Sequence, residues 1–215
     1  MVVDLLVIGA AITLGPLHNS AFILLLSAAG GIRKGLAFIL AWLASLVLVI
    51  AAVVLLTGGT PPERHSTPST AALSVKLALG LALVLYGERR RRRPPGRPRR
   101  QPGWQTKLDG LSGWTAAGLA ILLQPWAMVG AGAATAIDAD LSSAASVLAL
   151  TGYCVLATAS LLVMELYTAF SPGSAQPRLA GLRGWLDGHQ EQAIVAISLV
   201  VGLWLTGHSI YQLVG

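Results

Sequence analysis

Long apolar runs separated by short polar stretches dominate the chain. Six of these runs reach the length, about 20 mostly apolar residues, that an α-helix needs to cross the hydrocarbon core of a bilayer. Their approximate bounds are 3–29, 35–56, 71–87, 111–137, 141–170 and 191–213. The pattern therefore predicts an all-α integral membrane protein with six transmembrane helices.

Proline beside polar side chains interrupts two of the six runs near their middle, at 14–19 and at 123–126. Proline removes a backbone donor, and hydrocarbon holds no water for the freed carbonyl, so such breaks persist only where protein or a wet cavity covers them. Matched breaks in two halves of a chain are typical of the substrate site of a membrane transporter. The residues that we expect to bind substrate are Pro16, His18, Asn19, Gln124, Pro125 and Trp126.

Some of these residues also have a structural interpretation. His18 and Asn19 are of the kinds that form hydrogen bonds between neighbouring helices in many bundles. Trp126 is large enough to gate a cavity or simply to fill one. The sequence leaves both interpretations open.

Basic residues gather after the first, third and fifth runs. The loop after the second run has Arg64 beside Glu63 as its only Lys, Arg, Asp or Glu residues, and the loop after the fourth run has the acidic Asp138 and Asp140. Because loops rich in Lys and Arg stay in the cytoplasm, we expect a multi-pass protein of the plasma membrane with the odd-numbered loops inside and both termini outside. The basic residues that decide this orientation are Arg33, Lys34, the tract from Arg89 to Arg100, Lys107, Arg178 and Arg183.

Each half of the chain has three runs, which is an odd number. A second half built like the first must then enter the membrane in the opposite orientation, so the halves would form an inverted repeat. We expect one three-helix repeat at 1–88, an Arg/Pro-rich cytoplasmic loop at 89–107 and a second three-helix repeat at 108–215. Pro16 and Pro125 fall in the first run of their respective halves.

The composition agrees with a membrane protein and locates its charge. Charged residues make up 11% of the chain, against about 25% in an ordinary soluble domain. The net charge of +6 comes largely from one arginine tract, so it does not indicate a nucleic-acid-binding surface. Anionic lipid headgroups attract basic residues at a membrane surface by about 1 kcal/mol each. The residues expected to contact lipid headgroups are Arg89, Arg90, Arg91, Arg92 and Arg93.

A carboxylate and an amine lie inside the predicted spans. Glu165 is near the cytoplasmic end of its run, and a carboxylate inside a membrane is functional by default. We therefore take Glu165 and His18 as candidates for proton coupling, with an interfacial pair to an arginine as the alternative for Glu165. The position of Lys76, inside the membrane or at its surface, is equally open, because a flexible lysine side chain can extend to the membrane surface. Trp42 is interpreted as an anchor in the headgroup layer.

The sequence shows no pattern of an enzyme or a cofactor protein. Cys154 is the single cysteine, so no intramolecular disulfide or cysteine zinc site forms. The four histidines are scattered, without the helical spacing of a transition-metal site. No nucleophile stands next to a base, and His18 with Ser20 is not a triad pattern. We expect no catalytic residue, no metal and no cofactor.

Three short motifs suggest a family. They are Arg33-Lys34-Gly35-Leu36-Ala37-Phe38 running into Trp42, Lys107-Leu108-Asp109-Gly110-Leu111-Ser112, and Gly184-Trp185-Leu186. With these motifs, most of the chain resembles the actinobacterial GAP/Sap group, the peptidoglycolipid and sulfolipid addressing proteins of the lysine-exporter (LysE) superfamily. The resemblance implies six spans in two inverted three-helix units. It also implies a role in moving cell-envelope glycolipids or other small molecules outward, in some cases beside larger lipid exporters.

The chain departs from that family at its second break, where relatives tend to have an Asn-Pro-Lys-like element and this chain has Gln124-Pro125-Trp126. The leading interpretation is an exporter that moves a cell-envelope glycolipid or other small molecule by alternating access. One alternative is a scaffold of a lipid-export complex that does not itself transport, and another is an exporter of small solutes such as amino acids or cations. Expected partners are membrane lipids, the transported molecule, and a larger lipid exporter or a second copy of the chain.

Overall fold

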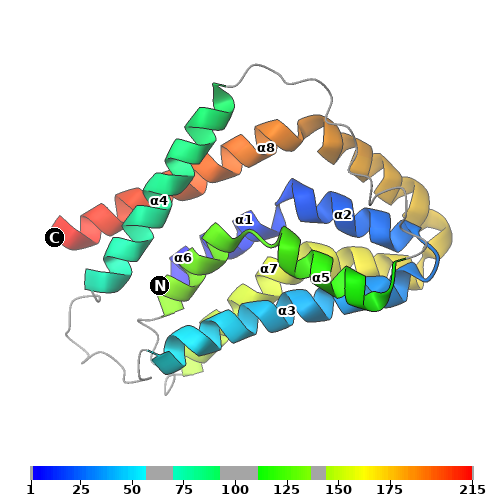
Figure 1. The fold of residues 1–215 in the computed structure, drawn as a ribbon, viewed down its shortest axis with the longest axis horizontal. Coiled ribbons are helices and arrows are strands. Elements are labelled where there is room, and N and C mark those ends of the chain that lie inside the picture. The colour runs from blue at the N-terminus through cyan, green and yellow to red at the C-terminus, as the bar shows by residue number, and fades with distance from the viewer. Residues whose placement is uncertain (1, 57–69, 93–110, 137–143, 215) are drawn as a thin grey trace.

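The structure, a computed structural model, describes residues 2–56, 70–92, 111–136 and 144–214. All regular structure in these residues is α-helical, which confirms the all-α part of the predicted fold class (Figure 1). The helices are α1 (Val2–Thr13), α2 (Pro16–Ser27), α3 (Gly31–Leu56), α4 (Thr70–Arg91), α5 (Gly113–Leu123), α6 (Trp126–Ala136), α7 (Ala144–Phe170) and α8 (Pro172–Val214).

Both proline breaks are present, each as a bend between two short helices. α1 and α2 meet at 49°, and α5 and α6 meet at 72°. Within the described residues, three helices, α3, α7 and α8, are individually long and apolar enough to cross a membrane, and five segments qualify if each bent pair counts as one span. The run at 71–87 forms most of α4, so six spans stay a prediction.

Large apolar side chains cover the outside of these helices as well as the inside. A helix at the surface of a soluble protein carries polar residues on its outer face, whereas the long helices here expose leucine and valine. This is the surface of a multi-pass membrane protein. Exposed examples are Leu40, Leu48 and Leu55 on α3, Leu148 and Val163 on α7, and Val200 and Leu203 on α8.

α8 begins at Pro172, so the prediction of a loop between 171 and 190 was wrong. Pro172 stands at the helix start, where its missing N–H costs nothing. The first part of α8 buries Ala175, Leu179 and Leu186 on one stripe while its other faces stay largely exposed. This amphipathic pattern was too weakly apolar to be recognised as part of a span. The 43 residues of α8 extend over about 64 Å.

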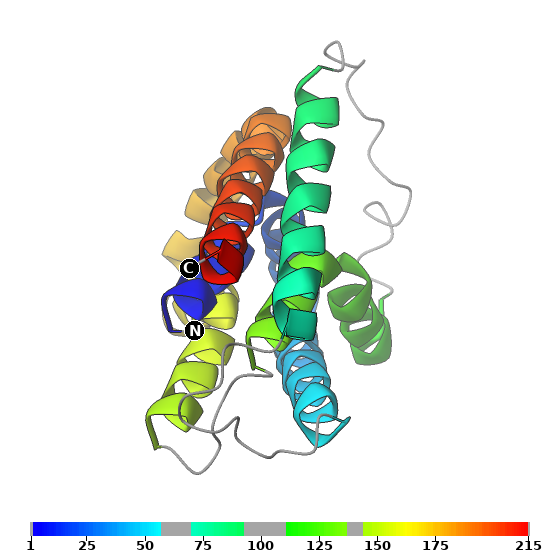
Figure 2. The same ribbon diagram turned by 90° about the vertical axis from the view of Figure 1, so that its left-hand side faces the viewer.

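The helices pack in pairs that join the two halves of the chain. α4 packs along α8, α3 along α5, and α1 along α7. Figure 2 shows α4 and α8 next to one another. The N-terminal part of α8 returns over α2, where the Gln176 side chain donates a hydrogen bond to the carbonyl of Leu26 at 3.3 Å.

The expected loop at 89–107 overlaps a helix. α4 continues to Arg91, so the first arginines of the tract belong to its last turn. Cationic side chains are favoured there, because the helix dipole places negative charge at the C-terminus. Arg93 and the remainder of the loop lie outside the described residues.

Candidate functional site

An open cavity of about 560 Å³ lies between the two breaks, and α4 and α8 contribute to its other walls. The α1–α2 break contributes Gly15 to His18, and the α5–α6 break contributes Leu122 to Met128. Most of the lining is apolar, including Leu83 of α4 and Ile194 and Ile197 of α8. Its volume is within the range of about 300–1,000 Å³ that is usual for ligand sites.

The first break is stabilised by backbone and side-chain donors that replace the missing proline N–H. In an uninterrupted helix, the amide of residue 16 would bond to the carbonyl of Ile12. Here Gly15 donates to that carbonyl at 3.0 Å instead. The Asn19 amide donates to the Thr13 carbonyl at 2.9 Å. Polar groups freed by the break therefore have partners inside the protein.

At the second break a tryptophan makes the equivalent bond. Pro125 leaves the carbonyl of Ile121 without its usual donor. The indole Nε1 of Trp126 donates to this carbonyl at 3.1 Å. Trp126 also lines the cavity, and it is a capping residue as much as a contact residue. Gating and packing were the two roles predicted for this side chain from the sequence, and the cap was not among them.

Two helix N-termini point their first turns at the cavity. Gly15, Pro16 and His18 belong to the start of α2, and Trp126 and Met128 to the start of α6. The first amides of a helix lack intrahelical acceptors and carry partial positive charge. α2 has no side-chain cap at its start. The C-terminal ends of α1 and α5 reach the same cavity at Ala11 and Leu123, so positive and negative helix-dipole ends both border it.

Two buried polar side chains on the cavity wall have hydrogen-bonding capacity left over. The Nε2 atoms of His18 and Gln124 are buried and have no hydrogen-bond partner among the described residues. The Oε1 atom of Gln124 accepts a hydrogen bond from the Ser45 hydroxyl of α3, which fixes the amide with its NH2 group unpaired. Buried polar atoms without partners are costly in a folded protein, which makes these two side chains the candidates for a ligand contact.

The indole ring of Trp42 packs against the imidazole ring of His18. The ring centroids of His18 and Trp42 are 4.7 Å apart, Trp42 is fully buried, and its indole donates to the carbonyl of Ala157 at 3.3 Å. The interpretation of Trp42 as a headgroup anchor was wrong, because this tryptophan lies in the core. Its position about three turns inside α3 was the signal that could have shown this.

Asn19 lies behind the cavity wall and not on it. Besides its bond to Thr13, its Oδ1 atom accepts a hydrogen bond from Ser160 of α7 at 2.8 Å. Thr13 itself donates to the carbonyl of Leu156. Hydrogen bonds thus connect the first break to α7. Asn19 has the role of a structural hydrogen-bonding residue between neighbouring helices.

Glu165 is separate from the cavity and lies between α7 and α3. Its carboxylate is buried, and neither oxygen has a hydrogen-bond partner among the described residues. Gly35 faces it, and a Cβ atom at that position would overlap Oε2. The glycine of the Arg33-Lys34-Gly35 motif therefore makes the space that the carboxylate occupies.

Arginines of the tract border a second hollow, on α4. This hollow, of about 350 Å³, is lined by Ala82, Leu85, Tyr86, Arg89 and Arg90, and it shares Ala82 and Tyr86 with the larger cavity. The sequence analysis missed Tyr86, whose position one turn before an arginine was the available signal.

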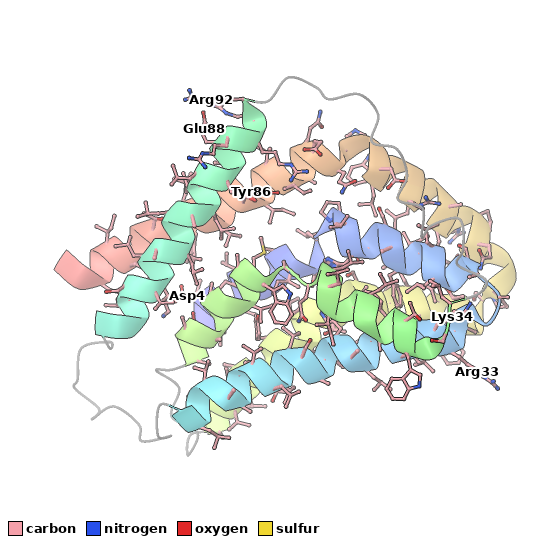
Figure 3. The ribbon with its side chains drawn as sticks, in the orientation of Figure 1. Asp4, Arg33, Lys34, Tyr86, Glu88 and Arg92 are labelled. Carbon is pink, nitrogen blue, oxygen red and sulfur yellow. The ribbon has the colours of Figure 1, made fainter. Side chains whose placement is uncertain are left out.

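Arg90 connects α4 to α8 at this hollow. Its guanidinium donates to both carboxylate oxygens of Glu191, at 2.5 and 2.7 Å, and to the Tyr86 hydroxyl. These bonds raise the pKa of Arg90. Figure 3 shows Tyr86 and Glu88 near the C-terminal end of α4. Hydrogen bonds from Arg91 and Arg92 lower the pKa of Glu88 to about 2.

Among the residues that the structure describes, no group of three or more His, Cys, Asp or Glu is placed to hold a metal ion. A search of curated proteins and a search of solved structures found no match. A family model, described as Sap, sulfolipid-1-addressing protein, matches residues 5–211. Because this match covers nearly the whole chain, including both breaks and at least most of each described helix, the protein belongs to the Sap, sulfolipid-1-addressing protein, family.

Proposed function

We propose that the protein is a membrane transporter that exports an amphipathic lipid by alternating access around the cavity between the two breaks. One observation carries this proposal: the two helix breaks meet at an otherwise apolar cavity whose wall includes His18 and Gln124, each with a buried nitrogen that has no hydrogen-bond partner among the described residues. Broken helices that aim their N-termini at a site within the membrane are characteristic of secondary transporters. The family description, with its reference to a sulfolipid, supports a lipid cargo.

The pairing of helices supports an inverted repeat. Exchange of the two halves maps α1 to α4 onto α5 to α8. Under this exchange the α1–α7 contact becomes the α5–α3 contact, and the α2–α8 contact becomes the α6–α4 contact, and all four are present. α4 packs on α8, its own counterpart, in antiparallel fashion, since Gly80 meets Thr206 and Gly87 meets Leu199. Equivalent helices related by an axis in the membrane plane must run antiparallel.

The arrangement of cationic and apolar surfaces favours a lipid with an anionic or strongly polar headgroup. Arg89 and Arg90 border the smaller hollow, which shares the lining residues Ala82 and Tyr86 with the apolar cavity. The cavity edge includes exposed apolar side chains such as Leu17 and Leu122. A lipid whose headgroup contacts His18 and Gln124 and extends towards the arginines, with its chain along the apolar wall, satisfies both surfaces.

The positions of the chain ends agree with the orientation that the basic loops predict. α1 begins and α8 ends at the same end of the bundle in Figure 1. Arg33 and Lys34, in the first turn of α3, lie at the opposite end (Figure 3). The positive-inside rule then places Arg33 and Lys34 in the cytoplasm and both chain ends outside.

We further propose that Glu165 and His18 take part in proton coupling. The Glu165 carboxylate has no hydrogen-bond partner among the described residues, so its charged form is unfavourable where it lies. His18 borders the transport cavity directly. Glu165→Gln should abolish transport driven by a proton gradient and leave downhill exchange in place. Undiminished driven transport by Glu165→Gln would remove this part of the proposal.

Two other functions stay as alternatives. The paired arginines at the end of α4, together with the tract that follows them, favour a scaffold that binds anionic lipid or a cytoplasmic partner. A cavity with uncharged donors also fits a small polar solute. Deletion of residues 89–100 separates the first alternative from transport. Loss of partner binding with retained transport would show two separate roles, and a stable partner complex without any transport would favour the scaffold.

The direct test is transbilayer movement of fluorescent lipids in liposomes that contain the purified protein. We expect movement of a headgroup-labelled anionic lipid that exceeds that of a zwitterionic one, and its loss in His18→Ala and Gln124→Ala. Gln192→Ala, at an exposed position of α8, is the matched control and should transport normally. Equal rates for protein-free liposomes and for wild-type protein would overturn the proposal, and transport of amino acids or cations alone would favour the small-solute exporter.

A further inference from the structure

A buried cluster of charged side chains lies at the end of α1 farthest from the cavity. Asp4 is in the first turn of α1 and is 1% exposed. The Lys76 amine is 4.0 Å from its Oδ2 atom, and Nε2 of His208 is 3.7 Å from its Oδ1 atom. The Trp204 indole donates a hydrogen bond to Oδ1 at 3.2 Å. Figure 3 shows Asp4 at this end of the bundle.

The cluster joins three helices from both halves of the chain. Asp4 comes from α1, Lys76 from α4, and His208 from α8. The sequence left open whether Lys76 extends to the membrane surface, and the structure buries it at 3% exposure. Asp4 was not recognised as a candidate at all. A carboxylate inside an apolar protein is tolerated when cations accompany it, and becomes very costly when they are removed.

The other helices that pack against α1 place few titratable groups near Asp4. α6 contains none in its sequence. From α7, Tyr153 meets α1 at Gly9, more than one helical turn beyond Asp4. The His208 side chain is 34% exposed, against 2% for Asp4, so His208 is the member nearest to the outside. Among the described residues, Lys76 and His208 are therefore the groups whose charge acts on Asp4.

A close crossing of α4 and α8 separates this cluster from the cavity. A Cβ atom on Gly202 would stand 2.8 Å from the carbonyl oxygen of Gly80, so the two backbones touch there. Small residues allow such contact between helices in a membrane. Lys76 is one turn from Gly80 on one side, and Leu83, which lines the cavity, is on the other.

The same order holds along α8. Ser198 lines the cavity one turn before Gly202, and Trp204 and His208 follow it. The charge cluster thus lies on one side of the crossing and the cavity wall on the other. A change in the angle between α4 and α8 at this crossing would alter both at once.

We propose that Asp4, Lys76 and His208 form a proton-exchange site that couples proton uptake to opening of this end of the bundle. With Asp4 ionised, its charge holds α4 and α8 against α1. Separation of the helices moves Lys76 and His208 away from the carboxylate, and it binds a proton on one of its oxygens, which raises the cluster's charge by one. This inference rests on the proposed transport function, because opening of this end matters only if it gives the transported molecule access to the cavity.

Distance measurements between spin labels test the site without reference to transport. The labels replace the exposed Val3 of α1 and Val75 of α4, in full-length protein with Cys154→Ser, in lipid nanodiscs. We expect a longer-distance population that grows as the pH falls from 8 to 5. Asp4→Asn should show the longer distance at every pH, a complete loss of pH dependence.

His208 and His189 supply a matched pair of variants on one helix. His208→Gln should change the pH at which the longer distance appears, whereas His189→Gln, an exposed site stacked on Trp185, should behave as the wild type. One unchanging distance distribution in the wild type at all pH values would overturn the site, and so would wild-type pH dependence in Asp4→Asn. The wild-type titration decides the matter even where Asp4→Asn does not fold.

The two proposals fail separately. A pH-dependent distance without lipid movement in liposomes would reject the transport function and retain the proton site. Lipid movement with a distance that ignores pH would reject the proton site alone.

Discussion

Gly35 of α3 leaves the space that the carboxylate of Glu165 occupies on α7, and a methyl group at position 35 would overlap its Oε2 atom. We predict that Gly35→Ala destabilises the protein by roughly 1–3 kcal/mol, the usual cost of overpacking, although alanine favours a helix over glycine by about 1 kcal/mol. In a Glu165→Ala background the same change should be close to neutral or stabilising. Thermal unfolding in detergent measures both effects.

Gly118 is the matched control, because a Cβ atom there meets nothing within 4 Å. Gly118→Ala should be neutral or stabilising. Equal destabilisation by Gly35→Ala with and without Glu165 would show that the glycine serves another contact, for example Leu26, whose Cδ2 atom is 2.9 Å from the same position.

A second prediction separates stability from function at Gln124. The Ser45 hydroxyl that bonds to Gln124 is also 2.9 Å from the carbonyl of Trp42, so it keeps an acceptor when the amide is removed. Gln124→Ala should therefore cost only about 1 kcal/mol of stability. Lipid movement should fall at least about tenfold, because a hydrogen bond to a charged ligand contributes roughly 1.5–3 kcal/mol. Unfolding and transport are measured on the same preparation.

Ser45→Ala distinguishes the donor from the amide that it orients. It should reduce transport less than Gln124→Ala does, since the NH2 group stays on the cavity wall. Full transport by Gln124→Ala would contradict the role of the unpaired amide as a ligand contact.

The apolar pattern predicted the helices well and one boundary badly. Long apolar runs, the breaks at Pro16 and Pro125, and the helical class follow from composition and from the missing proline donors. The start of α8 at Pro172 could not be predicted, because Ala175, Leu179 and Leu186 form only a short apolar stripe in the sequence. These residues are buried only when α2 and its neighbours pack over them. Pairing between helices of different halves is likewise a tertiary property.

The site was predictable where chemistry is local and not where it depends on a distant partner. His18 and Gln124 line the cavity because each stands beside its own proline. Asn19 shares that neighbourhood but faces Ser160 of α7, and no sequence pattern reveals that partner. Asp4 escaped notice because a single carboxylate near a chain end resembles a solvated residue until α4 and α8 enclose it.

Trp42 gives a third prediction. It is fully buried beneath His18, so Trp42→Ala should leave a cavity and cost roughly 3–5 kcal/mol. Trp42→Phe retains a ring against the imidazole and should cost clearly less. Trp185→Ala, at an exposed site on α8, should stay within about 0.5 kcal/mol of the wild type. Similar unfolding midpoints for Trp42→Ala and Trp185→Ala would place Trp42 at the surface after all.

The pH dependence of Glu88 gives a fourth. Arg91 and Arg92 hold its pKa near 2, below the ordinary 4.5. Because the folded value is the lower one, the contribution to the last turn of α4 is complete above pH 4.5 and disappears as the pH falls towards 2. A carbon-13 titration of the Glu88 carboxyl should have its midpoint near 2. Arg91→Gln with Arg92→Gln should move the midpoint up towards 4.5, and salt should do so partially. A midpoint near 4.5 in the wild type would show that these pairs do not form.

The cap at the second break gives a fifth prediction. Trp126→Phe keeps the ring but removes the indole N–H that bonds to the Ile121 carbonyl, and Pro125 offers no replacement. A carbonyl left without a donor in an apolar setting costs about 1–3 kcal/mol, so the unfolding midpoint should fall accordingly. Trp114→Phe, on the outside of α5 at 89% exposure, removes the same group and should have almost no effect. If the two variants were equally stable, the bend between α5 and α6 would depend on Pro125 alone.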